Sequence, residues 1–118
     1  MKLSAARINV ADIAAARIFY GTTLGLKQLW DWGTAVGYDV GCTLIVETHD
    51  PGDPEHSELV GRFSGLSFAA ADIDAAYRDL IAKGVAFLAP PEKMPWGGTL
   101  AHFKDPSGNI LTLVEVPR

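Results

Sequence analysis

A short motif occurs twice in this chain and constrains its fold more than any other feature. The segment Val10–Arg17 in the first half matches the segment Ala70–Tyr77 in the second half. Each copy follows residues that alternate between an apolar and a smaller or more polar face, which is typical of a β-strand. Each copy also leads to a glycine–apolar pair, at Gly25 and Gly84. A repeat of this length, present twice, indicates a duplicated supersecondary unit and not a solenoid.

Both copies of the motif predict a helix that begins at an aspartate. Asp12 and Asp72 precede the apolar positions, where a carboxylate accepts hydrogen bonds from the free amides at a helix start. The second helix carries an apolar stripe at i, i+3, i+4, i+7 and i+8 spacing and is expected to end at Gly84. The first helix is expected to run from about Asp12 to Thr23.

Short apolar and β-branched segments follow each helix and predict further strands. The predicted strands are Lys27–Trp32, Thr34–Val40 and Cys42–Thr48 in the first half, and Ala86–Leu88, Thr99–Lys104 and Asn109–Val116 in the second. The Asp105–Gly108 segment predicts a tight turn, since Pro106 fixes its own φ and Gly108 tolerates a positive φ.

Together these elements predict an α+β fold of two tandem βαβββ modules. Module one is expected at about residues 1–48, a Pro/Gly/Asp-rich linker at about 49–62, and module two at about 63–118. A sheet with a helix on one face leaves its other face bare. Two such sheets side by side form a curved, cup-shaped trough with the helices on its outer face.

Alternation along the strands selects the side chains that would line this trough. The polar candidates are Arg7, Asn9, Ser67, His102 and Thr112. The aromatic candidates are Trp30 and Trp32 on one strand, Trp96 in a loop, and Tyr38, which would line either the trough or a dimer seam. Flat aromatic walls with a few polar groups are typical of a site for a planar organic molecule.

Several of these residues have more than one interpretation. Each of the three tryptophans would either wall the ligand site or fill the sheet or a dimer interface. Arg7 would pair with an acidic ligand group or with a nearby carboxylate. His102 would be a pocket wall, a ligand contact or a general base, because its ordinary pKa is near 6.5. His49 and His56, in or beside the linker, are expected to be solvated.

Composition narrows the class of partner. The net charge of −4 argues against a nucleic-acid surface. Cys42 is the single cysteine, so no intramolecular disulfide is expected. No apolar run reaches the length that a membrane span needs, and Met1–Ser4 lacks the apolar region of a signal peptide. We therefore expect a cytoplasmic protein that binds neither nucleic acid nor membrane.

The two βαβββ modules, the Asp-led helix followed by Leu24–Leu26, and the Asp105–Asn109 segment resemble the vicinal oxygen chelate superfamily. This superfamily includes glyoxalases, extradiol dioxygenases, fosfomycin-resistance enzymes and bleomycin- and mitomycin-type drug-binding proteins. The resemblance covers essentially the whole chain, as a single domain of residues 1–118. It implies a homodimer, and a site in the trough.

Enzymes of that superfamily hold a divalent metal through His or Glu on the first and last strands of each module. The resemblance maps these positions to Ala5, Val46, Gly65 and Thr112, with Glu47 replacing Val46 if the fourth strand shifts by one residue. A divalent metal needs several imidazole or carboxylate donors, which this set does not supply. We therefore expect no metal and no other cofactor.

Three functions are compatible with these residues. The one we favour is metal-free binding of a small planar organic ligand, such as a drug, toxin or metabolite. The alternatives are a metal-dependent lyase, isomerase or dioxygenase of the glyoxalase type, and a metal-independent enzyme that uses His102.

Overall fold

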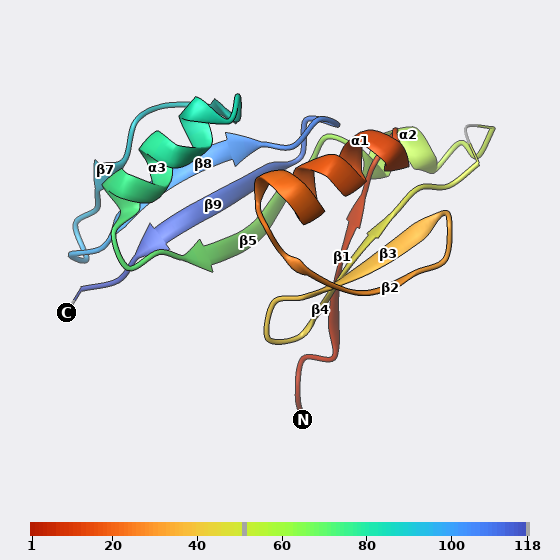
Figure 1. The fold of residues 1–118 in the computed structure, drawn as a ribbon, viewed down its shortest axis with the longest axis horizontal. Helices are drawn as coiled ribbons and strands as arrows, with labels where there is room; N and C mark the ends of the chain where they lie inside the picture. Colours follow the sequence, from red (N-terminus) through yellow and green to blue (C-terminus); the bar gives the residue numbers. More distant parts are fainter. Residues whose placement is uncertain (51, 118) are drawn as a thin grey trace. The chain divides into compact units, whose positions relative to one another are not determined.

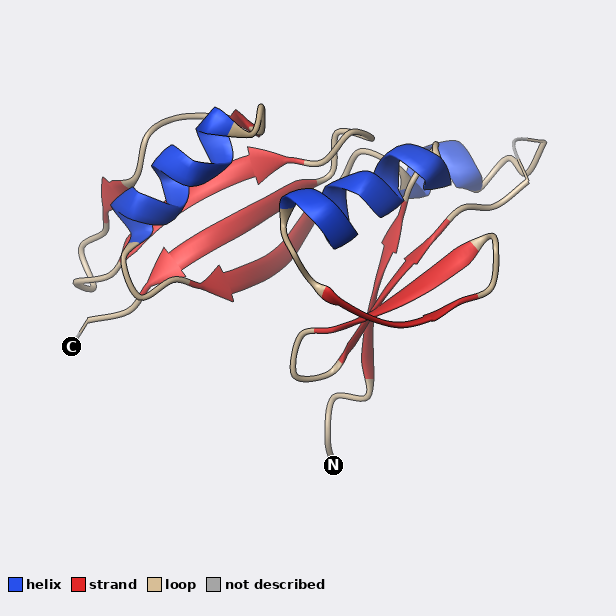
Figure 2. Cartoon of the chain, viewed as in Figure 1, coloured by secondary structure: helices blue, strands red, loops and turns tan. Residues whose placement is uncertain are grey.

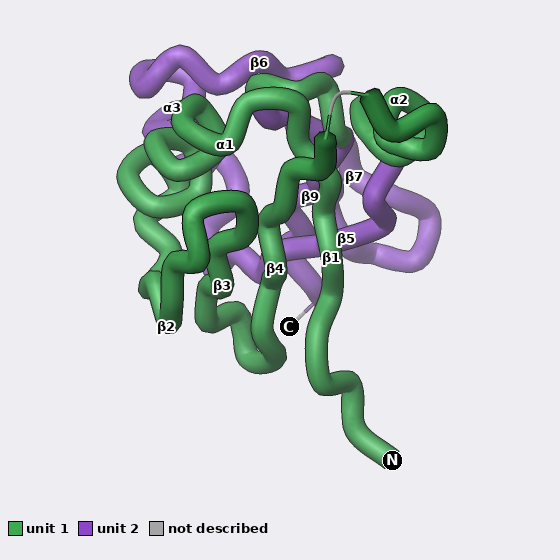
Figure 3. Tube along the Cα trace, turned by 90° about the vertical axis from the view of Figure 1, so that its right-hand side faces the viewer, with its two compact units in different colours: residues 1–62, 106–109 green, residues 63–105, 110–118 purple. Residues whose placement is uncertain are grey.

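Two mixed β-sheets, each accompanied by a helix, make up the computed structural model, which describes residues 1–50 and 52–117 (Figures 1 and 2). Residues 1–62 and 106–109 form one compact unit, and residues 63–105 with those from 110 onward form another (Figure 3). The predicted α+β fold class is confirmed. None of the helices in the described part of the chain is long and apolar enough to span a bilayer.

The elements of the first unit are β1 (Ala5–Asn9), α1 (Ile13–Arg17), the π-helical segment η1 (Ile18–Thr23), β2 (Lys27–Asp31), β3 (Ala35–Asp39), β4 (Thr43–Glu47) and α2 (His56–Leu59). Their sheet has the strand order β1-β4-β3-β2, in which β1 and β4 are parallel and the other pairs are antiparallel. The predicted capping role of Asp12 is confirmed, because its carboxylate accepts a hydrogen bond from the Ala15 amide at 3.1 Å.

The elements of the second unit are β5 (Phe63–Ala69), α3 (Ile73–Ala82), β6 (Ala86–Phe87), β7 (Glu92–Lys93), β8 (Thr99–Lys104) and β9 (Ile110–Glu115). The sheet order is β5-β9-β8-β6. The short strands β6 and β7 pair with opposite ends of the same edge of β8. Asp72 caps α3 through the Ala75 amide at 3.1 Å, as predicted. The sequence patterns did not predict β7 and α2, which are only a few residues long.

Opposite faces of the first sheet have different roles. The face toward the helix is buried and contributes Ile8, Val10, Val36, Tyr38, Leu44 and Val46 to a core that also contains Ala16, Phe19 and Tyr20 of the helix. Side chains alternate along a strand, so the neighbours of these residues in sequence lie on the other face. That second face carries Arg7, Asn9, Ala35, Gly37, Ile45 and Glu47, and it holds the site described below.

The second sheet follows the same rule. The helix α3 lies against β8 and β9 (Figure 1). The buried residues between the helix and the sheet include Ile73, Leu80, Ala101, Phe103, Leu111 and Leu113. The other face of this sheet carries His102 and Thr112, which are directly paired across β8 and β9. The trough predicted between two bare faces stays a prediction.

The turn after β8 belongs to the first unit and is fixed there by hydrogen bonds. Asn109 is 3% exposed, and its Oδ1 accepts from the backbone amides of Gly61 and Arg62 at 2.9 and 3.0 Å. Its Nδ2 donates to the backbone oxygen of Asn9 at 2.8 Å. Ser107 Oγ accepts from the Ala11 amide at 2.9 Å, and Gly108 has the positive φ that the sequence predicted.

We expect Asn109→Ala to lower the free energy of unfolding by about 2 kcal/mol or more, because it removes three part-buried hydrogen bonds and leaves two backbone donors and one acceptor without this partner. Ser107→Ala removes the bond to the exposed Ala11 amide and is expected to cost about 1 kcal/mol or less. Urea unfolding of both variants measures the difference. Equal losses for the two variants would contradict this role of Asn109.

Candidate functional site

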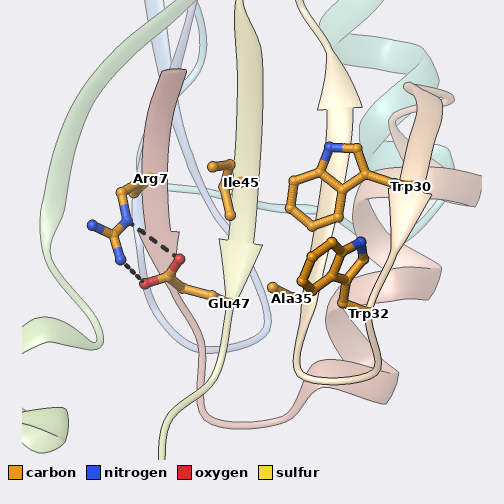
Figure 4. Close-up of a pocket in the computed structure, with 6 residues that line it drawn as sticks. All are labelled: Arg7, Trp30, Trp32, Ala35, Ile45 and Glu47. Atoms are coloured by element: carbon orange, nitrogen blue, oxygen red, sulfur yellow. Dashed lines mark hydrogen bonds and ion pairs between the residues drawn. The ribbon is translucent and has the colours of Figure 1, made fainter. Parts of the chain in front are cut away.

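An open pocket lies on the exposed face of the first sheet. Its volume is about 520 Å³, and its lining residues come from β1, β3, β4, the end of β2 and the loop that follows β2 (Figure 4). The lining residues are Arg7, Trp30, Trp32, Ala35, Ile45 and Glu47. An ion pair between Arg7 and Glu47 forms one end of the pocket. The indoles of Trp30 and Trp32 form the other end, and Ile45 and Ala35 lie between the two ends.

Arg7 and Glu47 form a two-point ion pair at the polar end. Arg7 Nη2 donates to Glu47 Oε1 at 2.6 Å, and Arg7 Nε donates to Glu47 Oε2 at 3.3 Å. His49 Nε2 lies 3.1 Å from the same Glu47 Oε1. The hydrogen bond to Glu47, and then its charge, raise the pKa of Arg7 further, so this side chain is a permanent cation. Of the two interpretations of Arg7, the structure supports pairing with a nearby carboxylate.

Trp30 lies flat over a glycine. A Cβ atom built on Gly37, its partner across β2 and β3, would fall within contact distance of the Trp30 indole ring. Any side chain at position 37 would therefore push the ring away from the sheet. The strand β2 also has an irregular register against β3 between Gln28 and Trp30.

Trp32 follows β2 in a loop that the helix holds in place. Arg17 of α1 donates to both Asp31 carboxylate oxygens at 2.8 and 3.0 Å and to the Gly33 backbone oxygen at 2.7 Å. The Asp31 carboxylate also accepts from the Gly33 amide at 2.8 Å. These bonds hold the residues on both sides of Trp32, while its own side chain is 82% exposed.

The two indoles meet edge to face. Their ring centroids are 6.1 Å apart and their planes are inclined by 65°, so the rings form the two sides of a corner. Trp30 and Trp32 were predicted to lie on one strand, and although Trp32 falls just beyond β2, both line this pocket. The apolar corner and the polar ion pair therefore lie at opposite ends of one small cavity.

A second group of predicted residues lies on the face of the other sheet that is turned away from α3. His102 Nδ1 is 2.8 Å from Thr112 Oγ1, and the Phe63 ring meets the imidazole edge to face. Ser67 is paired with Thr112 across β5 and β9. Thr112 is only 3% exposed, and its hydroxyl is within hydrogen-bond distance of the His102 ring.

The remaining predicted site residues have other surroundings. Tyr38 was predicted to line the trough or a dimer seam, and this is wrong, since its ring is buried against Tyr20 on the helix side of the sheet. Burial there raises the pKa of its phenol. The Trp96 ring folds over Gly98 within its own loop and is 54% exposed. The backbone oxygen of Asn9 is held by Asn109, as described above.

The residues at the superfamily's metal positions do not fit a divalent ion. Val46 is buried in the core, so it is Glu47 that lies on the exposed face, and Arg7 and His49 already occupy its oxygens. Ala5 offers no donor atom, and Gly65 has a positive φ that residues with side chains rarely adopt. Among the described residues, no three His, Cys, Asp or Glu side chains are grouped so as to hold a metal ion.

Sequence reasoning missed the residues that give the pocket its shape. Glu47 was considered only as a metal ligand, and neither Ala35 nor Ile45 was considered at all. Alternation along the predicted strands could have identified these lining residues, because Ala35, Ile45 and Glu47 fall on the face opposite the apolar core. The parallel pairing of β1 with β4, which brings Arg7 beside this face, is a long-range feature that alternation alone does not specify.

Comparisons with known proteins agree with this architecture. Residues 2–113 match the Glyoxalase/Bleomycin resistance protein/Dioxygenase superfamily. The chain is 34% identical to the uncharacterized protein YurT of Bacillus subtilis (strain 168), with 98% of this chain and 99% of that protein covered. It is also 34% identical, with a TM-score of 0.82 and 98% of both chains covered, to a member of the same superfamily from Sphaerobacter thermophilus DSM 20745.

A further solved structure is TnmS3, an antibiotic binding protein from Streptomyces sp. CB03234. It is 27% identical to this chain, with a TM-score of 0.79, and the match covers 99% of this chain and 97% of TnmS3.

The close approach of Trp30 to Gly37 yields a test by double substitution. Gly37→Ala should destabilise the protein by about 1 kcal/mol, because the new methyl group overlaps the indole. In a Trp30→Ala background the same substitution should be neutral or slightly stabilising, since alanine restricts the unfolded chain. Urea unfolding of the two single variants and the double variant gives the coupling energy. Additive effects would show that the two residues do not touch.

The Arg17–Asp31 pair yields a pH prediction. The hydrogen bond from Arg17, and next the one from the Gly33 amide, lower the pKa of the Asp31 carboxyl. A lowered folded-state pKa means that the pair stabilises the fold fully above about pH 4, the ordinary value, and that this contribution is lost as the pH falls through the folded pKa.

Carbon NMR of the Asp31 carboxyl between about pH 2 and pH 6 should give a midpoint below the ordinary value of about 3.9. Arg17→Gln should return the midpoint toward that value, and the indole N–H signal of Trp32 should then broaden or shift at neutral pH. A wild-type midpoint at or above the ordinary value would contradict the pairing.

Proposed function

Because the chain belongs to the glyoxalase/bleomycin resistance protein/dioxygenase superfamily, we propose that it binds a small planar organic molecule in the pocket of its first unit, without a metal. The observation that carries the proposal is the indole corner facing an ion pair across an apolar floor. A planar ligand would lie on Ile45 and Ala35 with its ring against Trp32 and its polar edge toward the ion pair.

The size and lining of the pocket support this assignment. A volume of about 520 Å³ falls in the usual range for small-molecule sites, which have mostly apolar walls and a few polar groups. An exposed tryptophan offers a large flat surface, and aromatic pairs gain about 0.5–1.5 kcal/mol beyond the area that they bury. The 82% exposure of Trp32 leaves that surface free for a ligand ring.

The similarity to TnmS3 supports a binding function. That relative is an antibiotic binding protein, and the two chains match over nearly their whole length. A metal-dependent lyase, isomerase or dioxygenase is disfavoured by the donor chemistry at positions 5, 47, 65 and 112. Metal-free catalysis by His102 has weaker support, because the described contacts of its imidazole are a threonine hydroxyl and a phenylalanine ring.

One finer feature of this proposal comes from the family resemblance. We propose that the protein is a homodimer, which sedimentation equilibrium distinguishes from a monomer. A cytoplasmic location stays a prediction, which fractionation of the producing cell tests.

Tryptophan fluorescence tests the binding proposal directly. In a Trp96→Phe variant only Trp30 and Trp32 emit, and a panel of planar aromatic and heterocyclic compounds should include ligands that quench this emission and shift it to the blue. Trp32→Ala should weaken binding of such a ligand by about tenfold, equivalent to about 1.4 kcal/mol of stacking. Trp96→Phe is the matched control and should leave the affinity unchanged within about twofold.

The absence of quenching by every compound in the panel would contradict the proposal. So would a ligand whose affinity survives Trp32→Ala but falls with Trp96→Phe, because that result would place the binding site in the other unit.

A further inference from the structure

The ion pair presents its negative member to the interior of the pocket. Figure 4 shows the Glu47 carboxylate between the Arg7 guanidinium and the indoles of Trp30 and Trp32. The Arg7 side chain is 65% exposed, so solvent and salt screen its charge. The Glu47 side chain is 10% exposed, and its charge is screened less. A ligand that lies between the two ends of the pocket therefore meets the carboxylate first, although the ion pair as a whole is neutral.

One acceptor position of this carboxylate is open. An ionised carboxylate has about four lone-pair sites, two on each oxygen. Oε1 of Glu47 has two neighbours, Arg7 Nη2 at 2.6 Å and His49 Nε2 at 3.1 Å. Oε2 has one described partner, Arg7 Nε at 3.3 Å, which is long for a bond between charged groups. Oε2 can therefore accept a hydrogen bond from a ligand without displacing a protein partner.

The opposite end of the pocket also favours positive charge. The face of an indole attracts a cation within about 6 Å of the ring centre. Trp30 and Trp32 form their corner with ring planes inclined by 65°. Ile45 and Ala35, which lie between the corner and the carboxylate, have no polar side-chain atoms. Among the described lining residues Arg7 is the only cation, and it stands behind the carboxylate.

From these contacts we propose that the pocket selects organic cations, namely planar aromatic ligands that carry a protonated amine directed at Glu47 Oε2. This inference rests on the proposed function and adds the chemical class of the ligand. A charged N–H donor forms a hydrogen bond to a carboxylate that is about twice as strong as one between neutral groups. Glu47 is then the residue that determines specificity, and Arg7 is a positioning residue that orients the carboxylate and moderates its charge.

The same arrangement disfavours anions. A ligand carboxylate in the position of the ammonium would face Glu47 as a like charge, and such a juxtaposition is costly at a binding surface. It would also have to lie beyond Glu47 to reach the guanidinium of Arg7. The pocket is therefore expected to rank ligands of one shape by their charge, in the order cation, neutral donor, anion.

A matched set of probes tests this ranking. The probes are (2-naphthyl)methylammonium, 2-naphthalenemethanol and 2-naphthoate, which share one ring system and differ in the polar group. Calorimetric titration at pH 7 should show the ammonium binding about tenfold more tightly than the neutral alcohol, and 2-naphthoate binding most weakly. The indole N–H signals of Trp30 and Trp32 should shift when the ammonium binds. This measurement uses the wild-type protein and needs no variant.

Variants then assign the selectivity to one side chain. Glu47→Gln removes the negative charge and keeps an oxygen for Arg7, so the ammonium should bind about tenfold more weakly while the alcohol changes by less than about twofold. The double variant R7M/E47Q leaves no unpaired charge and should bind the three probes within about threefold of one another.

Asp79→Asn is the matched control for charge. It removes one exposed carboxylate from α3, where Asp79 pairs with Lys83, and it should change each affinity by less than about twofold. Melting curves check that all three variants fold.

Equal affinities of the three probes, or tightest binding of 2-naphthoate, would overturn the selectivity for cations and leave the proposed binding function standing. Tight binding of the ammonium that survives Glu47→Gln would overturn the role of Glu47. Failure of all three probes to bind, with no shift of either indole signal, would overturn this inference, and the broader compound panel decides the proposed function separately.

Discussion

The parallel pairing of β1 with β4 is the constraint on which the pocket depends. In this register Ile8 lies beside Val46 and Asn9 beside Glu47, so apolar side chains face the helix and polar ones face outward. A slip of one residue would exchange the two faces of the strand and bury Arg7 or Glu47 in the core. Ile8, Val36 and Val46 are buried on the helix side of the sheet. Their neighbours in sequence are therefore placed on the opposite face, and these are the side chains that a ligand in the pocket would contact.

The ion pair on the outward face follows from a second energetic requirement. A carboxylate that is 10% exposed must have compensating partners, because desolvation penalises its charged form. Arg7 supplies the charge and two hydrogen bonds, and His49 approaches the same oxygen. In a superfamily enzyme a metal ion would supply positive charge on such a face. Here an arginine does so, and unlike a metal ion it keeps hydrogen-bond donors pointing away from its partner.

Most of the fold could be predicted because local patterns and tertiary structure agree. The duplicated Asp-led motif fixed both helix starts, and alternation located the long strands to within one or two residues. Short elements such as β7 carry too few residues for a periodic signal. Tyr38 was misplaced because a tyrosine is equally compatible with a ligand wall and a core, although alternation puts it on the same face of β3 as the buried Val36.

The aromatic wall shows why pocket chemistry depends on residues outside the pocket. Gly37 has no contact of its own to offer a ligand, yet its missing side chain is what lets the Trp30 indole lie on the sheet. Arg17 belongs to the helix on the other face, yet its bonds to Asp31 and Gly33 fix the loop that carries Trp32. An exposed indole that must order itself on binding would lose affinity to conformational entropy. Under the proposed function, the contact of Trp30 with Gly37 and the bonds on both sides of Trp32 would lower this entropic cost for a planar ligand.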